Sequence, residues 1–328
     1  MRAAVEPATD GDDSVEDRLA ELKRAKTIRR VVSVLAVVTF AVVFYWSLLL
    51  VGFSIAELLQ YRQQFLSALS DFFPTTTATV AGVQLPVLDA GAYWAFLAAQ
   101  TNPTIPRAAL TTLAIGFAGT VLGAPGALAF GVLGSERVTP FPLNFLFRGV
   151  MSTIRAIPAL VWALIFIPLG GLSPFTATLA IGTDTVGNLG RLFTDELEEV
   201  ADGPIEAIES TGGSRPQVVT FGMLSQVFRP FIAWTMYILE INVRIAVTMG
   251  LIGAGGIGQI LRIERGQFHY TNMMATILVI FVLVVSVEMV SQRTRSYLRP
   301  EEADESLPTL LWRLVTGLPE RMADAARR

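Results

Sequence analysis

The sequence predicts an all-α polytopic membrane protein with six transmembrane helices and both termini in the cytoplasm. Only 16% of the 328 residues are charged, against about 25% in soluble domains, and 52% are hydrophobic. Five runs contain no Asp, Glu, Lys or Arg: 31–56, 108–135, 156–183, 245–261 and 271–287. A bilayer core of roughly 30 Å needs about 20 apolar residues per helix, and backbone groups in lipid must bond internally. These runs are therefore expected to be helices.

The N-terminal part divides into a tail, a first helix and a polar interval. Residues 1–30 are expected to be a cytoplasmic tail, acidic up to residue 22 and ending in the basic stretch KRAKTIRR. Residues 31–53 form transmembrane helix 1, because the apolar run is too long and too far from the start for a cleavable signal peptide. Residues 54–105 are expected to be extracytoplasmic, with TTTATVAGVQLPV irregular or extended. Side chains at helical steps predict an interfacial amphipathic helix within this interval: Leu58, Tyr61, Phe65, Leu69 and Phe72.

The other five helices are expected within residues 106–297. We place them at about 107–133, at 145–169, from about 175, at 228–251 and at 273–290, with a polar loop at about 195–227. Residues 298–328 form a cytoplasmic tail in which LPTLLWRLVTGL is expected to be a short interfacial helix. Basic residues favour the cytoplasmic side of a membrane protein. With both termini in the cytoplasm, only four basic residues lie on the outer side: Arg62, Arg107, Arg262 and Arg265.

Composition excludes several functions. The chain has no cysteine and a single histidine, His269, which we expect to be a solvated surface residue. Both lysines lie in the N-terminal tail, so no Gly-Lys-Ser/Thr phosphate loop exists and the chain is not expected to hydrolyse ATP that way. A net charge of −3 gives no reason to expect nucleic acid as a partner. The carboxylates are also scattered along the chain. Because an enzyme needs its reactive groups clustered at one cavity, the sequence disfavours a membrane-embedded enzyme.

The stretch GLIGAGGIG contains the spacing G-x-G-x-x-G of a dinucleotide-binding turn. Its glycines are Gly253, Gly255, Gly256 and Gly258. Such a fingerprint requires a preceding strand and a βαβ unit. Here a membrane helix is expected before the glycines and a polar loop on the outer face after them. We therefore expect no dinucleotide, and interpret the glycines as a gate or hinge that allows close approach and bending between helices.

The polar loop carries the most specific pattern in the chain. Pro204 begins a short amphipathic segment, and Gly212 ends it. The loop resembles the hallmark of bacterial ABC-importer membrane subunits: E-A-A, three residues, Gly, nine residues, Ile, one residue, Leu-Pro. Four residues fall on this register: Glu206, Ala207, Gly212 and Leu224. Three residues depart from it: Ile208 replaces the second Ala, Gly222 the Ile, and Ser225 the Pro.

Further stretches narrow the resemblance to phosphonate-type ABC transporter permeases. They are STIRAIPALVWALIF, GPIEAIESTGGSRPQVV, LEINVRIAVTMGLIGAGGIG and FHYTNMMATILVI, and the resemblance covers about residues 105–297. It implies a type I ABC-importer permease fold in the bacterial inner membrane and transport of phosphonate, phosphate or phosphite. It also implies a second copy of the chain, a cytosolic ATPase dimer that binds ATP and Mg²⁺, and an extracytoplasmic substrate-binding protein. Asp184 stands where many such permeases have a histidine.

Ionisable residues inside the predicted helices are candidates for a translocation path. An ionisable residue at mid-bilayer costs about 2.5–3.5 kcal/mol, so it tends to face the bundle interior or water. The candidates are Arg155, Asp184, Glu240 and Arg244, with Asn188. Glu240 and Arg244 are four residues apart and can pair on one helix face, so a purely structural ion pair stays open beside a pathway role. Guanidinium matches the oxygens of phosphate and phosphonate, which favours Arg244 as the anion contact. Asn242 is expected to bond between helices.

Two alternatives remain for the function. A permease of the same superfamily could carry an amino acid or another small solute, and the intramembrane arginines distinguish this from an oxyanion. An autonomous channel or secondary carrier is the second alternative. The polar loop argues against it, because a solitary transporter needs no contact with an ATPase.

Overall fold

The computed structural model describes residues 12–80, 83–99 and 104–298. Contacts divide the chain into two compact units, Met1–Ser67 and Ala68–Arg328. The stretch LPTLLWRLVTGL, expected to be an interfacial helix, lies outside the described residues.

The first unit is built on the long helix α1 (Asp12–Val51). The structure corrects the expected start at residue 31, because the helix already includes the second half of the predicted tail. Within this unit, nothing buries the apolar residues of its membrane-spanning part, Arg24–Val51. A face of this size persists where lipid or another protein covers it.

The predicted interfacial helix consists of two pieces, which is a second correction. Helix α2 (Ile55–Gln60) starts at Ser54, whose side chain accepts a hydrogen bond from the Glu57 amide, and it ends at Tyr61. Helix α3 (Arg62–Phe72) follows. The predicted helical spacing is therefore confirmed, although the helix is interrupted at the single residue Tyr61.

The second unit is not purely α-helical. Strands β1 (Thr75–Val80) and β2 (Val83–Leu88) pair antiparallel, with Thr75 opposite Leu88, where the sequence predicted only an irregular or extended stretch. Helix α4 (Ala90–Ala99) follows the hairpin, and its Tyr93 hydroxyl donates to the Phe72 carbonyl at 2.6 Å.

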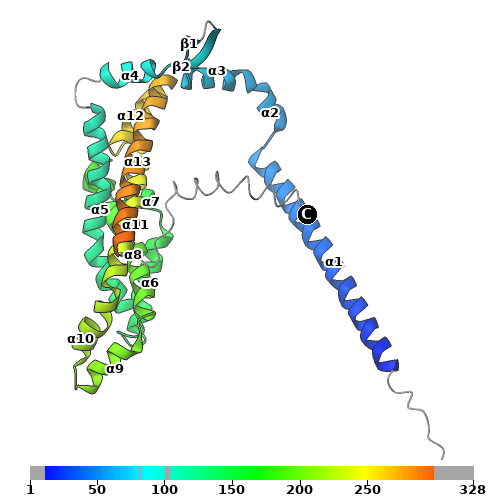
Figure 1. Cartoon of the computed structure of the whole chain (residues 1–328), viewed down its shortest axis with the longest axis vertical. Helices are drawn as coiled ribbons and strands as arrows, with labels where there is room; N and C mark the ends of the chain where they lie inside the picture. Colours follow the sequence, from blue (N-terminus) through cyan, green and yellow to red (C-terminus); the bar gives the residue numbers. More distant parts are fainter. Residues whose placement is uncertain (1–11, 81–82, 100–103, 299–328) are drawn as a thin grey trace, which may run out of the picture. The chain divides into compact units, whose positions relative to one another are not determined.

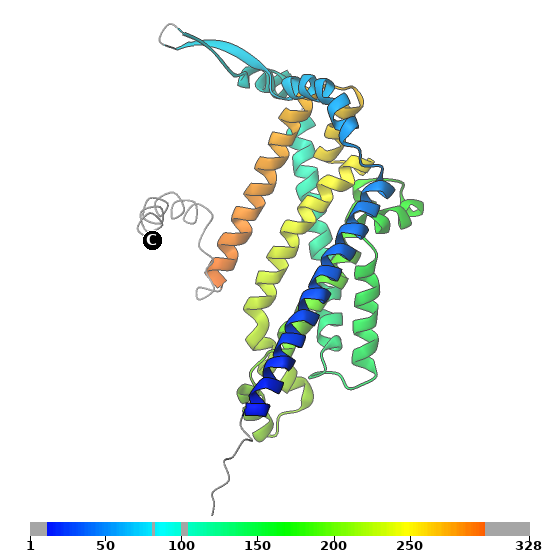
Figure 2. The ribbon, with the colours of Figure 1, turned by 90° about the vertical axis from the view of Figure 1, so that its right-hand side faces the viewer.

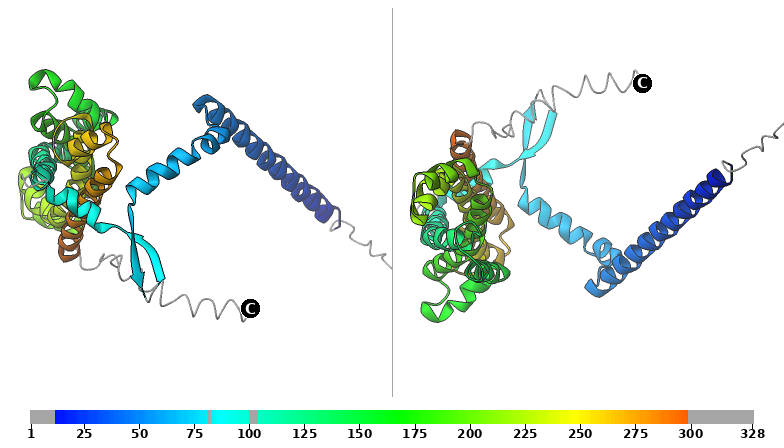
Figure 3. Two further views of the ribbon diagram at one scale, coloured as in Figure 1. Left: turned by 90° about the horizontal axis from the view of Figure 1, so that it is seen from above. Right: turned by 90° about the horizontal axis from the view of Figure 1, so that it is seen from below.

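The remaining helices form a bundle (Figure 1). Its long members are α5 (Thr104–Gly134), α8 (Pro174–Glu198), α11 (Ser225–Ile252) and α13 (Tyr270–Leu298), with the shorter α6 (Leu143–Ala156) and α7 (Ala159–Ile165) beside them. Figure 2 shows α13 and α11 running along the bundle, and Figure 3 shows the helices close to end-on. Two short helices, α9 (Asp202–Ser210) and α10 (Arg215–Gln217), lie at the end opposite α12 (Ile257–Gly266) (Figure 1).

Within the described residues, four helical segments are long and apolar enough to cross a membrane, or five when α6 and α7 count as one span. Helix α8 is not among them, because Asp184, Asn188 and Arg191 make it more polar. The chain is thus a multi-pass membrane protein. It has five spans if α8 does not cross the membrane and the predicted six if α8 does.

The predicted helix at 145–169 is divided at Pro158 into α6 and α7. Helices α6 and α7 meet at a bend of 88°, and a short 3₁₀ turn, η1 (Ile167–Leu169), follows α7. Pro158 has no amide hydrogen to continue the helix, and it keeps Ile157 extended, with φ −101° and ψ 115°. The indole of Trp162 donates to the Ile154 carbonyl at 3.3 Å across the bend, which fixes its geometry.

Small residues allow α5 and α8 to pack closely. On α5 they recur at steps of four, as Gly119, Gly123, Ala127 and Gly131, while Gly116 lies against Val243 of α11. A Cβ atom at Gly123 would lie 2.4 Å from the Gly182 carbonyl oxygen of α8. Without a hydrophobic effect between helices in lipid, such backbone proximity is a main source of helix association. Two apolar clusters extend this contact to α7 and α11.

Replacing Gly123 by alanine should lower the unfolding midpoint of the purified protein in detergent. The new methyl group meets backbone atoms, and overpacking of this kind costs about 1–3 kcal/mol. Gly149→Ala is the matched control, because no atom lies within 4 Å of its Cβ position in α6. Equal midpoints for the two variants would contradict the close contact between α5 and α8.

Candidate functional site

Charged side chains of α11 and α13 form one network. The predicted pair is confirmed, since Nη2 of Arg244 donates to Glu240 Oε1 at 2.5 Å. The same nitrogen lies 3.5 Å from Glu288 Oε2 on α13. Arg295 of α13 is 3.5 Å from Glu240 Oε2. Sequence reasoning did not identify Glu288, and it counted Arg295 only as a cytoplasmic charge.

Arg244 is only partly satisfied by this network. Its side chain is 48% exposed in the isolated chain, whereas the Glu240 side chain is 7% exposed. Both ion pairs use Nη2, and within the described residues Nε and Nη1 have no hydrogen-bond partner. Thr248, one turn further on, is also exposed, so this face of α11 is polar inside the bilayer. A polar face of this kind suits water or a partner subunit better than lipid.

The other candidates gather where α6 breaks. Nε of Arg155 donates to Asn188 Oδ1 at 3.2 Å, and the Asn188 amide donates to the Asp184 carbonyl at 3.1 Å. The stem of Arg155 lies against Gly187, where a Cβ would be 2.9 Å from Arg155 Cγ. Three positions of one α8 face thus hold Arg155 at the last turn of α6. The predicted candidates therefore belong to two clusters, one on α6 and α8 and the other on α11 and α13.

Asn242 bonds between helices, as the sequence predicts. It is 1% exposed, and its amide donates to Thr120 Oγ1 at 2.9 Å and to Thr185 Oγ1 at 2.8 Å. These bonds link α11 to α5 and α8. Both amide hydrogens are engaged in the protein, so Asn242 fixes the packing around the site.

At the opposite end of the fold from α12, the predicted docking segment is helix α9. Glu206 and Ala207 are exposed on it, while Ile205 and Ile208 are half-buried. The half-buried face contacts η2 (Val218–Leu224), a π-helical segment that leads into α11 and contains the predicted residue Leu224. This contact gives α9 a packing partner within its own chain.

Gly212 ends the turn after α9 with a positive φ of 79°, which favours glycine. The next helical turn, α10, begins at Arg215 and is capped by Ser214, whose amide and hydroxyl both donate to Gln217 Oε1. The chain passes from α10 through η2 into α11 without a break in helical backbone. Movement of α9 can therefore be transmitted directly to the helix that carries Arg244.

Two departures from the importer pattern lie against each other. A Cβ at Gly222 would be 3.3 Å from Ile208 Cδ1. The pattern has a small residue at position 208 and isoleucine at 222, and this chain has the reverse. The exchange of sizes keeps the contact between α9 and η2 filled, a relation that only the folded structure reveals.

Polar contacts tie the start of α9 to its surroundings. Arg137 in the α5–α6 loop pairs with Asp202 at 2.6 Å, and Arg215 donates to the Arg137 carbonyl at 3.0 Å. Gln226 of α11 bonds both the amide and the carbonyl of Ala201, each at 3.2 Å. The helix is therefore anchored at its base, while the face with Glu206 stays open.

The glycine block joins two helices instead of a strand and a helix, as predicted. It leads into helix α12, however, and not into the expected polar loop. Gly253, Gly255 and Gly256 have positive φ angles of 109°, 95° and 72°. A Cβ at Gly258 would lie 2.0 Å from the Val247 carbonyl oxygen. The turn needs glycine for backbone conformation and for close packing, and its role as a gate or hinge stays a prediction.

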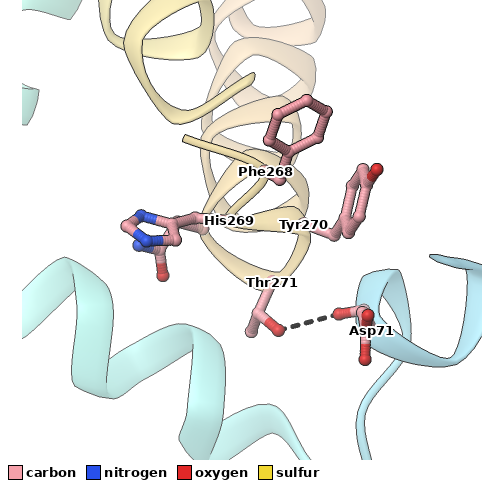
Figure 4. Close-up of a pocket in the computed structure, with 6 residues that line it drawn as sticks. Asp71, Phe268, His269, Tyr270 and Thr271 are labelled. Atoms are coloured by element: carbon pink, nitrogen blue, oxygen red, sulfur yellow. Dashed lines mark hydrogen bonds between the residues drawn. The ribbon is translucent and has the colours of Figure 1, made fainter. Parts of the chain in front are cut away.

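A shallow pocket of about 300 Å³ lies where α12, α13 and the end of α3 meet (Figure 4). The Thr271 hydroxyl donates to the Asp71 carbonyl at 2.7 Å. His269 is about half exposed, and its Nδ1 is 3.1 Å from Glu264 Oε2, which also accepts from Asn272 at 3.0 Å. The histidine is thus at the surface, as expected, and belongs to contacts that hold the α12–α13 junction.

Comparison with known proteins agrees with this arrangement. Residues 123–300 match the family described as "Binding-protein-dependent transport system inner membrane component". The chain is 30% identical to the putative phosphite transport system permease protein HtxC of Stutzerimonas stutzeri, over 66% of this chain and 79% of the relative. It is 33% identical to the phosphate-import permease protein PhnE of Mycolicibacterium smegmatis, over 58% of this chain but only 36% of that longer protein.

The fold is also found among solved structures. An inward-facing form of the MetNI methionine ABC transporter superposes with a TM-score of 0.55 at 21% identity, over 60% of this chain and 96% of the solved one. At this identity the likeness establishes the fold alone. With a family match over more than half of its length, the chain belongs to the inner membrane components of binding-protein-dependent transport systems, the permease subunits of ABC importers.

Proposed function

We propose that this chain imports phosphonate or a related phosphorus oxyanion, such as phosphate or phosphite, across a bacterial inner membrane. Two copies would form the pathway, with a cytosolic ATPase dimer that binds ATP and Mg²⁺ and an extracytoplasmic binding protein that delivers the anion. The names of the phosphite and phosphate relatives support the cargo. Six spans, counting α8, and cytoplasmic termini complete the proposal, supported by the distribution of basic residues.

The observation that best supports an oxyanion as the cargo is the partly unpaired guanidinium of Arg244. A phosphorus oxyanion binds guanidinium through two parallel hydrogen bonds, which need two neighbouring nitrogens. In Arg244 one nitrogen is engaged by carboxylates and the others have no partner among the described residues. The group is therefore held in place, and its Nε and Nη1 can still donate to an anion, while Nη2 is shared with the carboxylates. Two copies of the chain would present two such groups to one path.

Replacing Arg244 by alanine should reduce uptake of phosphonate by about tenfold or more, the effect of losing a charged hydrogen-bond partner. Glu240 keeps Arg295 in this variant, so the buried carboxylate retains a counter-ion. Arg244→Lys keeps the positive charge but loses the two parallel hydrogen bonds, so its uptake should lie between that of the wild type and that of Arg244→Ala. The measurement is uptake by the complete transporter in vesicles.

Arg265→Ala serves as the control, since Arg265 is an exposed arginine of α12 away from the network. Uptake at the wild-type rate in both Arg244 variants would remove Arg244 from the path. Competition between phosphonate and amino acids in the same assay separates the two classes of cargo.

We further propose that α9 is the element through which the ATPase acts on the bundle. Its exposed face offers Glu206 and Ala207 to a partner, and its half-buried face rests on η2. A short exposed helix that is anchored at its base and packed on η2, which continues into α11, suits this task. Chemical energy then enters from outside the chain, which agrees with the absence of a phosphate loop in the sequence.

The size exchange between positions 208 and 222 provides a test of transmission. Gly222→Ile places a large side chain against Ile208 and should displace α9, lowering uptake per ATP hydrolysed by about fivefold or more. Adding Ile208→Ala to this variant restores the space and should recover coupling. The measurement is the ratio of uptake to ATP hydrolysis in the assembled transporter.

Gly203→Ala is the control within α9, because no atom lies within 4 Å of its Cβ position. Two results would show that the contact between α9 and η2 does not couple ATP hydrolysis to transport. One is a wild-type ratio of uptake to hydrolysis in Gly222→Ile, and the other is a ratio in the double variant no higher than in Gly222→Ile.

A further inference from the structure

The network between α11 and α13 holds its two carboxylates unequally. Glu240 is 7% exposed, and each of its oxygens faces an arginine, Oε1 at 2.5 Å from Arg244 and Oε2 at 3.5 Å from Arg295. The guanidinium of Arg295 also stacks over the Tyr237 ring, 5.7 Å from its centroid. Glu240 is therefore held in place by burial and by two arginines, one of which also contacts Tyr237.

Glu288 is held more weakly. Its side chain is 28% exposed, and Oε2 lies 3.5 Å from the same Arg244 nitrogen that Glu240 approaches to 2.5 Å. Its other oxygen accepts a hydrogen bond from the Gln292 amide at 3.1 Å, within its own helix. Longer distance and greater exposure both weaken an ion pair. Separating Glu288 from Arg244 therefore takes less free energy than separating Glu240 from it.

An anion that reaches Arg244 meets a network of two arginines and two carboxylates with no net charge. It can bind the guanidinium by replacing Glu288 while Glu240 stays in place. The displaced carboxylate then remains beside the anion and repels it. A transport path needs such a balance, because a site that binds too tightly does not release its cargo.

On the basis of the proposed function, we propose that Glu288 is the exchangeable counter-ion of Arg244 and sets how tightly a phosphorus oxyanion is held in the path. Glu288 competes with the anion for one guanidinium and returns to it when the anion leaves. The role is specific to this carboxylate, since Glu240 is retained by Arg295.

The test is binding of radiolabelled inorganic phosphate and methylphosphonate to the assembled transporter, without the binding protein. Glu288→Gln keeps the size of the side chain and its contact with Gln292 but removes the charge. It should increase affinity by about twofold to fivefold, the range for one partly exposed ion pair, and slow uptake at saturating substrate. Glu288→Asp, which keeps the charge, should stay near wild type. Met289→Leu, at an exposed neighbouring position, is the control.

The gain in affinity should vanish in the double variant Arg244→Ala with Glu288→Gln, because the competing groups share one arginine. A purely structural link between α11 and α13 would instead lower the unfolding midpoint of Glu288→Gln and leave affinity unchanged. Unchanged affinity, or a gain that persists in the double variant, overturns the inference. If wild-type binding is below detection, binding that appears in Glu288→Gln supports it, and none in either variant contradicts it.

Failure of the proposed function gives a different pattern. If Glu288→Gln has wild-type affinity but Arg244→Ala still abolishes uptake, the path through Arg244 stands and only the counter-ion role falls. If the wild-type transporter accumulates another solute and neither phosphate, phosphite nor phosphonate, the assigned cargo is wrong.

Discussion

Charge neutralisation in a low-dielectric environment is the constraint on which this structure depends. An ionisable group within the bilayer must face a partner or water, and most such groups here meet a partner inside the chain. Glu240 faces two arginines, and Arg155 is seated against α8 through Asn188 and Gly187. Arg244 and Arg155 are both exposed and each bonds through a single nitrogen, but Arg244 meets carboxylates of two helices whereas Arg155 meets a neutral amide. Only Arg244 therefore belongs to a network in which carboxylates hold the guanidinium.

The two ends of the core have different tasks in this account. At one end the glycine turn before α12 is closely packed and needs positive φ angles. At the other, α9 packs on η2, and η2 continues into α11. Helix α9 lies at the end of the bundle opposite α12 (Figure 1). The helix that carries Arg244 therefore connects a partner-facing surface with the turn. π-Helical segments often occur at functional sites, and η2 lies at the junction where movement would enter the bundle.

Features set by local periodicity could be predicted from the sequence. Composition predicts the membrane, and helical spacing predicts the Glu240–Arg244 pair and the segment that became α9. Features set by tertiary contact could not. The sequence at 145–169 predicts a helix but not its bend of 88°, and no spacing rule relates Glu288 to Arg244 or Ile208 to Gly222. The hairpin at 75–88 was missed because its alternation is weak.

If the Arg244 face of α11 lines a water-filled path for anions, a cysteine placed on that face is accessible to reagents dissolved in water. The chain has no native cysteine, so a single Thr248→Cys substitution one turn from Arg244 gives a unique thiol. In the assembled transporter this thiol should react with an anionic, membrane-impermeant reagent, and phosphonate should slow the reaction. Phe281→Cys, exposed on the apolar face of α13, should stay unreactive. Equal inertness of both thiols, with and without ATP, would contradict the account.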